Sequence, residues 1–74
     1  MMKMEDFRLA RDMPFVKRGM RVMHREKWGR VAGANRSANL NIIFDGEKIS
    51  KNCHPHWAMR YFDKSGRMVA EYGK

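Results

Sequence analysis

The chain has little that would cross-link it covalently or place it in a membrane. It contains one cysteine, Cys53, among 74 residues, which excludes an intrachain disulfide and is typical of a reducing compartment. No apolar run approaches the roughly 20 residues that a membrane-spanning helix needs. The first twelve residues lack the apolar stretch of a signal peptide. We therefore expect a cytoplasmic protein that makes no contact with a membrane.

The residue sets on which most enzymes depend are also missing. The sequence offers no paired carboxylates, no phosphate-binding glycine loop and no Ser/His/Asp set. A single domain of this size buries only about 60% of the surface that its unfolded chain exposes, so there is little room for a deep catalytic cavity. We predict that the protein is not an enzyme and binds no cofactor.

Acidic residues are scarce, and the imbalance is local. Sixteen Lys and Arg stand against eight Asp and Glu, which gives a net charge of +8. Between residues 17 and 36 the only acid is Glu26, against seven basic residues: Lys17, Arg18, Arg21, Arg25, Lys27, Arg30 and Arg36. A local positive field attracts polyanions, and the planar fork of arginine suits phosphate. We predict that the partner is nucleic acid or an acidic protein surface; the alternative is a solvated face without a partner.

Possible metal ligands gather in one short stretch, "NCHPHW", at residues 52–57. A structural zinc site needs four ligands, commonly as two spaced pairs. Cys53, His54 and His56 are adjacent instead, and neighbours on an extended chain point to opposite sides. The one remaining histidine is His24. A catalytic Cys/His pair would need a third group to orient its base. We therefore predict no metal site and interpret this stretch as a corner of the fold, with Cys53 as a small buried apolar residue.

Alternation of apolar and polar residues predicts strands. Three stretches follow this period: 20–25, 28–33 and 39–44. Residues 26–28 are expected to form the turn of the first hairpin. Asp45 and Gly46 indicate a type I′ hairpin turn, which needs positive φ at both central residues, and Ile49 is expected to anchor a fourth strand. Residues 67–72 are the final strand.

Two other stretches predict helix. Residues 3–12 carry acids near their start and a basic residue near their end, which agrees with a helix dipole, and Pro14 stops the helix. Within residues 54–62, two pairs are spaced as on a helical turn: Trp57 with Tyr61, and Ala58 with Phe62. We expect this helical turn just before the last strand, where Trp57 and Phe62 close one end of the fold.

Strands this short leave costly open edges unless their sheet curls and closes. We predict a mainly β fold, a small antiparallel barrel of about five strands with a helical turn before the last one. Residues 1–14 are an N-terminal extension with a short helix, and residues 15–74 form the barrel.

The motifs "VKRGMRV" at residues 16–22 and "WGRV" at residues 28–31 resemble the opening of KOW-type modules, which have SH3-like barrels. The later "FDGEKISKNCHPHW" resembles the third strand, tight turn, fourth strand and final helical turn of such barrels. The resemblance spans residues 15–72 and implies a binding module for RNA, DNA or a partner protein. The small size, basic charge and many methionines also resemble uncharacterised phage or prophage proteins.

The first hairpin is the predicted binding site. On a strand, Arg21 and Arg25 share the face opposite Val22. Trp28 either stacks on a base, which is worth about 1–3 kcal/mol, or packs against the N-terminal helix. The predicted nucleic-acid-binding residues are Arg21, Arg25, Lys27, Trp28, Arg30 and Arg36. The alternative function is a protein-interaction or inhibitory module of phage origin that binds an acidic partner surface.

Overall fold

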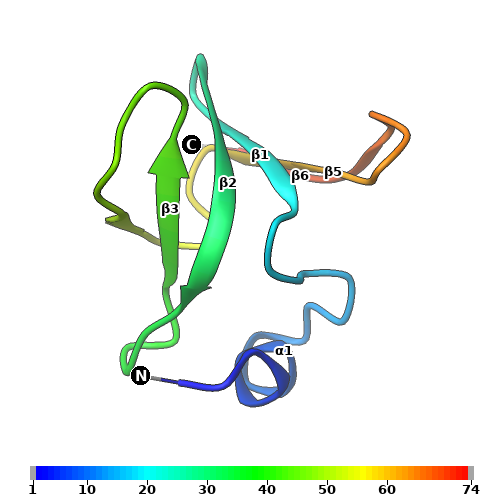
Figure 1. Ribbon diagram of the computed structural model, residues 1–74. Helices are drawn as coiled ribbons and strands as arrows, with labels where there is room; N and C mark the ends of the chain where they lie inside the picture. The colour runs from blue at the N-terminus through cyan, green and yellow to red at the C-terminus, as the bar shows by residue number, and fades with distance from the viewer. Residues whose placement is uncertain (1, 74) are drawn as a thin grey trace.

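A computed structural model describes residues 2–73 (Figure 1). One helix, α1 (Met4–Arg11), precedes six strands: β1 (Arg21–His24), β2 (Lys27–Ala34), β3 (Leu40–Phe44), β4 (Lys51–Cys53), β5 (Met59–Phe62) and β6 (Met68–Tyr72). The strands pair antiparallel in one sheet with the order β4-β3-β2-β1-β5-β6. The predicted mainly β fold, its antiparallel strands and its short N-terminal helix are confirmed, with six strands in place of five.

The sheet bends strongly about β1. In Figure 1, β2 and β3 stand upright while β5 and β6 run across them, and the molecule measures 26 × 25 × 24 Å along its axes. β1 joins the two halves, since Val22 lies between Gly29 of β2 and Tyr61 of β5. Register shifts in β2 and β5 add to the bending. Among the described residues β4 and β6 each pair on one side only, so hydrogen bonding leaves the sheet open.

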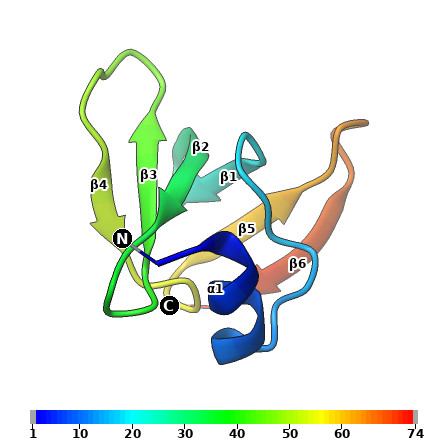
Figure 2. The same ribbon diagram turned by 60° about the horizontal axis from the view of Figure 1, so that its bottom comes forward.

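One core serves the helix and the sheet alike. Figure 2 shows α1 lying over the opening between the two halves of the sheet. Phe7 of the helix, and Met13 and Val16 after it, have no exposed surface. The Nε atom of Arg11 donates to the carbonyl of Ala38 at 2.7 Å, which ties the helix to the β2–β3 loop. The buried apolar side chains are Met4, Phe7, Met13, Val16, Met20, Val22, Val31, Ala34, Leu40, Ile42, Phe44, Cys53, Met59 and Tyr61. Within residues 2–73 no helix is long and apolar enough to cross a membrane.

The alternating stretches form strands where the sequence predicts them, and the turns between them differ. The first hairpin turns at Arg25 and Glu26, with φ of 58° at Arg25, so β2 already begins at Lys27. Of the two central residues of the turn after β3, Asp45 and Gly46, only Gly46 has positive φ, at 85°, and the predicted type I′ turn is therefore wrong. The chain continues as a loop to β4, and Ile49 is 78% exposed instead of anchoring a strand.

The predicted helical turn before the last strand is wrong over its second half. Residues 59–62 are the strand β5, in which Met59 and Tyr61 are buried and Arg60 is exposed. Only residues 55–58 turn, and Ala58 has a φ of 54° that ends any helical path. Trp57 does not close an end of the fold, because it is 61% exposed.

Tyr61, and not Trp57, is the fully buried aromatic residue of this segment. Its ring has no exposed surface, and its hydroxyl donates to the carbonyl oxygen of Pro55 at 2.6 Å. Burial raises the pKa of Tyr61 above the ordinary value of 10.0. The unfolded tyrosine therefore ionises first. The stability that comes from this group is complete below pH 10 and is lost as the pH rises from there toward the pKa of the folded state.

The Tyr61→Phe variant is expected to lose about 1–2 kcal/mol at pH 7, because the Pro55 carbonyl keeps no donor. Above pH 10 the natural chain loses the stability that comes from the Tyr61 hydroxyl, and the variant does not. The difference in free energy of unfolding between the two chains should therefore narrow, by up to about 1.4 kcal/mol per pH unit. Urea unfolding between pH 7 and 11 measures both effects. Tyr72→Phe is the matched control, since the Tyr72 hydroxyl makes no hydrogen bond within residues 2–73; it should change stability at pH 7 by less than about 0.5 kcal/mol. A gap for Tyr61→Phe that stays constant up to pH 11 would contradict this account.

Candidate functional site

The side of β2, β1 and β5 that faces away from the core carries a mixed row of cationic and apolar side chains. Strand register places Arg21 opposite Arg30 and Met23 opposite Trp28 across β1 and β2. On the other side of β1, the partner of Arg21 is Phe62. We call this surface the outer face, and its members are Arg21, Met23, Trp28, Arg30, Arg60 and Phe62. Three predicted binding residues, Arg21, Trp28 and Arg30, therefore come together.

Arg21 forms an ion pair with a carboxylate of the protein itself, that of Asp45. Its two Nη atoms donate to the two carboxylate oxygens of Asp45 at 2.8 and 2.9 Å. These hydrogen bonds lower the pKa of Asp45. Both side chains are about half exposed, so the pair contributes little to stability. It does fix the guanidinium, whose central carbon lies 5.3 Å from the centroid of the Trp28 ring.

The other three predicted binding residues lie elsewhere. Arg25 is in the turn of the first hairpin and therefore does not share a strand face with Arg21. Lys27 lies on the core side of β2, with its Nζ 5.7 Å from the ring centroid of Phe44. Arg36 is in the β2–β3 loop, at the opposite end of β2 from that turn (Figure 1). The predicted alternation of core-facing and outward-facing residues is right within β1 and ends at Arg25, where the chain turns.

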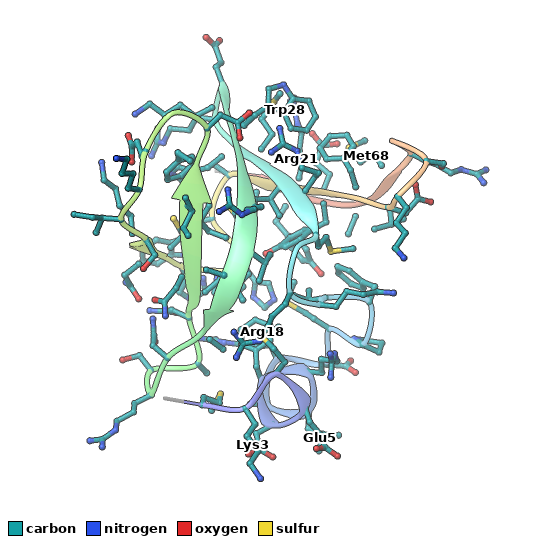
Figure 3. The ribbon with its side chains drawn as sticks, in the orientation of Figure 1. Lys3, Glu5, Arg18, Arg21, Trp28 and Met68 are labelled. Atoms are coloured by element: carbon teal, nitrogen blue, oxygen red, sulfur yellow. The ribbon has the colours of Figure 1, made fainter. Side chains whose placement is uncertain are left out.

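A groove of about 1050 Å³ adjoins the outer face. One wall is the segment before β1, residues 14–20, and the other is the β5–β6 hairpin. Its aromatic lining is Phe15, Trp28 and Phe62, and its cations are Lys17, Arg18, Arg21 and Lys64. Figure 3 places Arg21 and Trp28 at the end of the sheet away from α1, and Arg18 nearer the helix. Ligand sites are commonly concave, mostly apolar and furnished with a few polar groups, and this groove has that character.

Trp28 contacts the β5 side of the groove, and the predicted alternative contact with the N-terminal helix is wrong. The centroids of its ring and the Phe62 ring are 4.8 Å apart, with 49° between the ring planes. The indole nevertheless stays 40% exposed. A large apolar ring that is exposed within a concave surface indicates a binding site more strongly than an isolated exposed apolar residue does.

The charges of the groove are partly fixed by local structure. Arg18 donates from Nη1 to the carbonyl of Ala32 at 2.8 Å, which holds it against β2. Asp63 is the only acid in the lining. Its Oδ1 accepts from the Ser65 hydroxyl at 2.7 Å and from the backbone N–H of Arg67 at 3.0 Å. These bonds lower the pKa of Asp63 and engage one of its carboxylate oxygens in the β5–β6 turn. Positive charge therefore dominates the groove.

Sequence reasoning missed several groove residues. Lys17 and Arg18 belong to the basic stretch but precede the predicted hairpin, and Lys64 lies in an ordinary turn. Phe62 was expected at a closed end of the fold. The signal that could have found Lys17 and Arg18 is their position directly before Gly19, where a φ of 83° turns the chain into β1.

The "NCHPHW" stretch carries the chain from β4 to β5 and forms a second cluster. His54 stacks on Trp57, with ring centroids 4.4 Å apart, and its Nδ1 accepts from the backbone N–H of His56 at 3.1 Å. Burial, and then the charges of Arg11 and His56, lower the pKa of His54. Burial also raises the pKa of the Cys53 thiol, which disfavours the reactive thiolate. In the part of the chain that the structure describes, no three His, Cys, Asp or Glu side chains are grouped to hold a metal ion.

No family model, no curated protein and no solved structure matches this chain.

Proposed function

We propose that the protein is a cytoplasmic nucleic-acid-binding module of the SH3-like kind, whose contact surface is the outer face together with the groove. The observation that carries the proposal is the combination in one groove of three aromatic rings with four cations and a single acid. Phosphates attract the cations, and bases find flat apolar rings on which to stack. The proposal assigns the protein no enzymatic reaction and no cofactor.

The SH3-like interpretation is part of the proposal. It is supported by a strongly bent antiparallel sheet of short strands that surrounds one core. Fold alone does not select a function, so the proposal depends on the site. The net charge of +8 adds a long-range attraction for polyanions.

A second candidate function, a protein-interaction or inhibitory module, is favoured by β6. This edge strand pairs with β5 only, within the described residues, and it exposes Met68 and Val69 next to the groove. An extended segment of a partner could add to such an edge through backbone hydrogen bonds. Failure to bind any nucleic acid at low salt would favour this candidate.

Removing one cation from each wall of the groove should weaken nucleic-acid binding. We expect the double variant Lys17→Ala, Lys64→Ala to bind a short random oligonucleotide roughly tenfold less tightly at low salt. The slope of log K against log salt should become shallower by about 1.4, since each contact to a single strand accounts for about 0.7. Fluorescence anisotropy of a labelled oligonucleotide, between about 50 and 200 mM salt, measures both quantities.

The matched control removes the same charge elsewhere. Lys3 lies beside α1, at the opposite end of the molecule from Trp28 in Figure 3, and Lys48 lies in the β3–β4 loop. The double variant Lys3→Ala, Lys48→Ala should keep affinity within about twofold, because neither side chain lines the groove and the attraction between exposed charges that make no direct contact is weakened by salt. An equal loss of affinity in the two double variants would mean that net charge alone drives binding, and it would contradict the proposal that the groove is the contact surface.

A further inference from the structure

We infer that the groove accepts an unpaired base of a single-stranded nucleic acid, with the base against Trp28 and Phe62 and the neighbouring phosphates at the basic rim. The inference rests on the proposed function and narrows its ligand. The proposed function requires only that a polyanion binds, whereas this inference requires that the bases take part.

The aromatic surface is shaped for contact with a flat ligand. Because the planes of Trp28 and Phe62 are inclined at 49°, the two rings do not cover each other fully. Phe15, on the opposite wall, packs edge-on against Tyr61 with ring centroids 5.5 Å apart. The groove therefore keeps uncovered apolar surface, since Trp28 is 40% exposed and Val69 is 43% exposed. Bases are planar and stack on such rings whatever their sequence.

The cations lie where a backbone on either side of the base would pass. Lys17 belongs to one wall and Lys64 to the other, and the rings of Trp28 and Phe62 line the same groove. This arrangement, with cations on both walls and rings in the lining, matches a single strand whose base points inward and whose phosphates stay outside. It does not match a duplex, in which the base faces are already stacked and a base would have to be flipped out at a cost of a few kcal/mol.

Arg21 contributes a second kind of surface. Because both of its Nη atoms are bonded to Asp45, a phosphate would have to displace that carboxylate to gain the same fork. The guanidinium lies over the Trp28 ring, and it can offer its outer side to a base as a further stacking surface, as arginine planes do in the recognition of unpaired bases. The Arg21–Asp45 pair therefore suits a stacking role better than a role as phosphate clamp.

A comparison of three probes of equal length tests the inference. They are a single strand, the same strand with abasic sites, and a duplex, each made as DNA and as RNA to tell these two sources apart. The chain has two tryptophans, so the Trp57→Phe background reports from Trp28 alone. We expect the single strand to quench Trp28 emission. The abasic strand and the duplex should bind at least about fivefold more weakly than the single strand.

A variant supplies the second measurement. Phe62→Leu keeps an apolar side chain at half-buried Phe62 and removes the aromatic face. The variant should bind the single strand several-fold more weakly and the abasic strand as tightly as the natural chain does. The slope of log K against log salt should stay the same for both strands. The probe comparison uses an unaltered groove, so it decides the question even where this variant folds poorly.

The outcomes separate the inference from the function beneath it. Equal affinity for the intact and abasic strands, with both weakened by Lys17→Ala, Lys64→Ala, would overturn the inference and keep the proposed function. Tighter binding to the duplex would overturn it in the same way. If the protein binds none of the probes at low salt, both the inference and the proposed nucleic-acid-binding function are wrong.

Discussion

Replacing Phe7 by alanine is expected to lower the free energy of unfolding by about 3–5 kcal/mol. Phe7 is on the N-terminal helix α1, yet its ring has no exposed surface and belongs to the same core as the sheet. The change removes the buried ring and leaves a cavity that closes poorly, because the Met2–Ala34 bridge before the helix and the Arg11–Ala38 hydrogen bond at its end hold α1 in place. A domain of this size has a total stability of only about 4–11 kcal/mol. The variant should therefore lose at least about a quarter of the stability of the natural chain, and all of it where that stability is close to 4 kcal/mol.

Leu9→Ala is the matched control for this prediction, since Leu9 is on the same helix and is 80% exposed. It should change the free energy of unfolding by less than about 0.5 kcal/mol. Urea unfolding followed by far-ultraviolet circular dichroism measures both variants. A loss of less than about 1 kcal/mol for Phe7→Ala would mean that the helix is an appendage, and that the sheet forms its core without it.

The second large effect is expected at Gly29, where β2 and β3 approach closely. A Cβ atom at this position would lie 2.8 Å from Cγ2 of Ile42, 3.0 Å from the carbonyl oxygen of Ile43 and 3.1 Å from Cδ1 of Phe44. The backbone oxygen cannot move without disturbing the pairing of the two strands. We expect Gly29→Ala to cost about 1–3 kcal/mol, and Gly29→Val roughly 3 kcal/mol or more, because overpacking forces shifts that a dense core resists.

Gly33 offers a control within the same strand. The nearest atom to a Cβ built there is Nη1 of Arg18, at an ordinary 3.6 Å. Gly33→Ala should therefore stay within about 0.5 kcal/mol of the natural chain. Thermal and urea unfolding of the three variants give the comparison. Equal stability of Gly29→Ala and Gly33→Ala would show that β3 can move away from β2 at little cost.

The strands were predictable because burial on one face of a sheet leaves a period of two in the sequence. Leu40, Ile42 and Phe44 are buried while the residues between them are not, and this pattern appears directly in the chain. The turns were less predictable. Asp45 and Gly46 have the composition of a type I′ turn, but the side chain of Asp45 bonds to Arg21 and only Gly46 takes positive φ. Tertiary contacts of this kind leave no local pattern.

The misassigned helical turn has a different cause. Tyr61 and Phe62 each lie four residues after another apolar side chain, which is a helical spacing, and four is also a multiple of the strand period. The ambiguity is resolved by pairing, since β5 adds to the free edge of β1. Three of the six outer-face residues, Arg21, Trp28 and Arg30, were predictable for the same reason as the strands, because they follow the period of two. The groove was not, because it joins residues 14–20 to the β5–β6 hairpin, and their proximity exists only after the sheet bends.

The central place of β1 has a consequence for how the chain is made. Its first neighbour, β2, follows at once, but its second, β5, comes from much later in the chain. On a ribosome, the emerging first four strands would carry a bare edge at β1, with unsatisfied backbone groups that can pair with another nascent chain. Until β5 arrives, Arg25 and Lys27 outweigh Glu26 at one end of that bare edge, and the like charges of neighbouring chains would repel each other there.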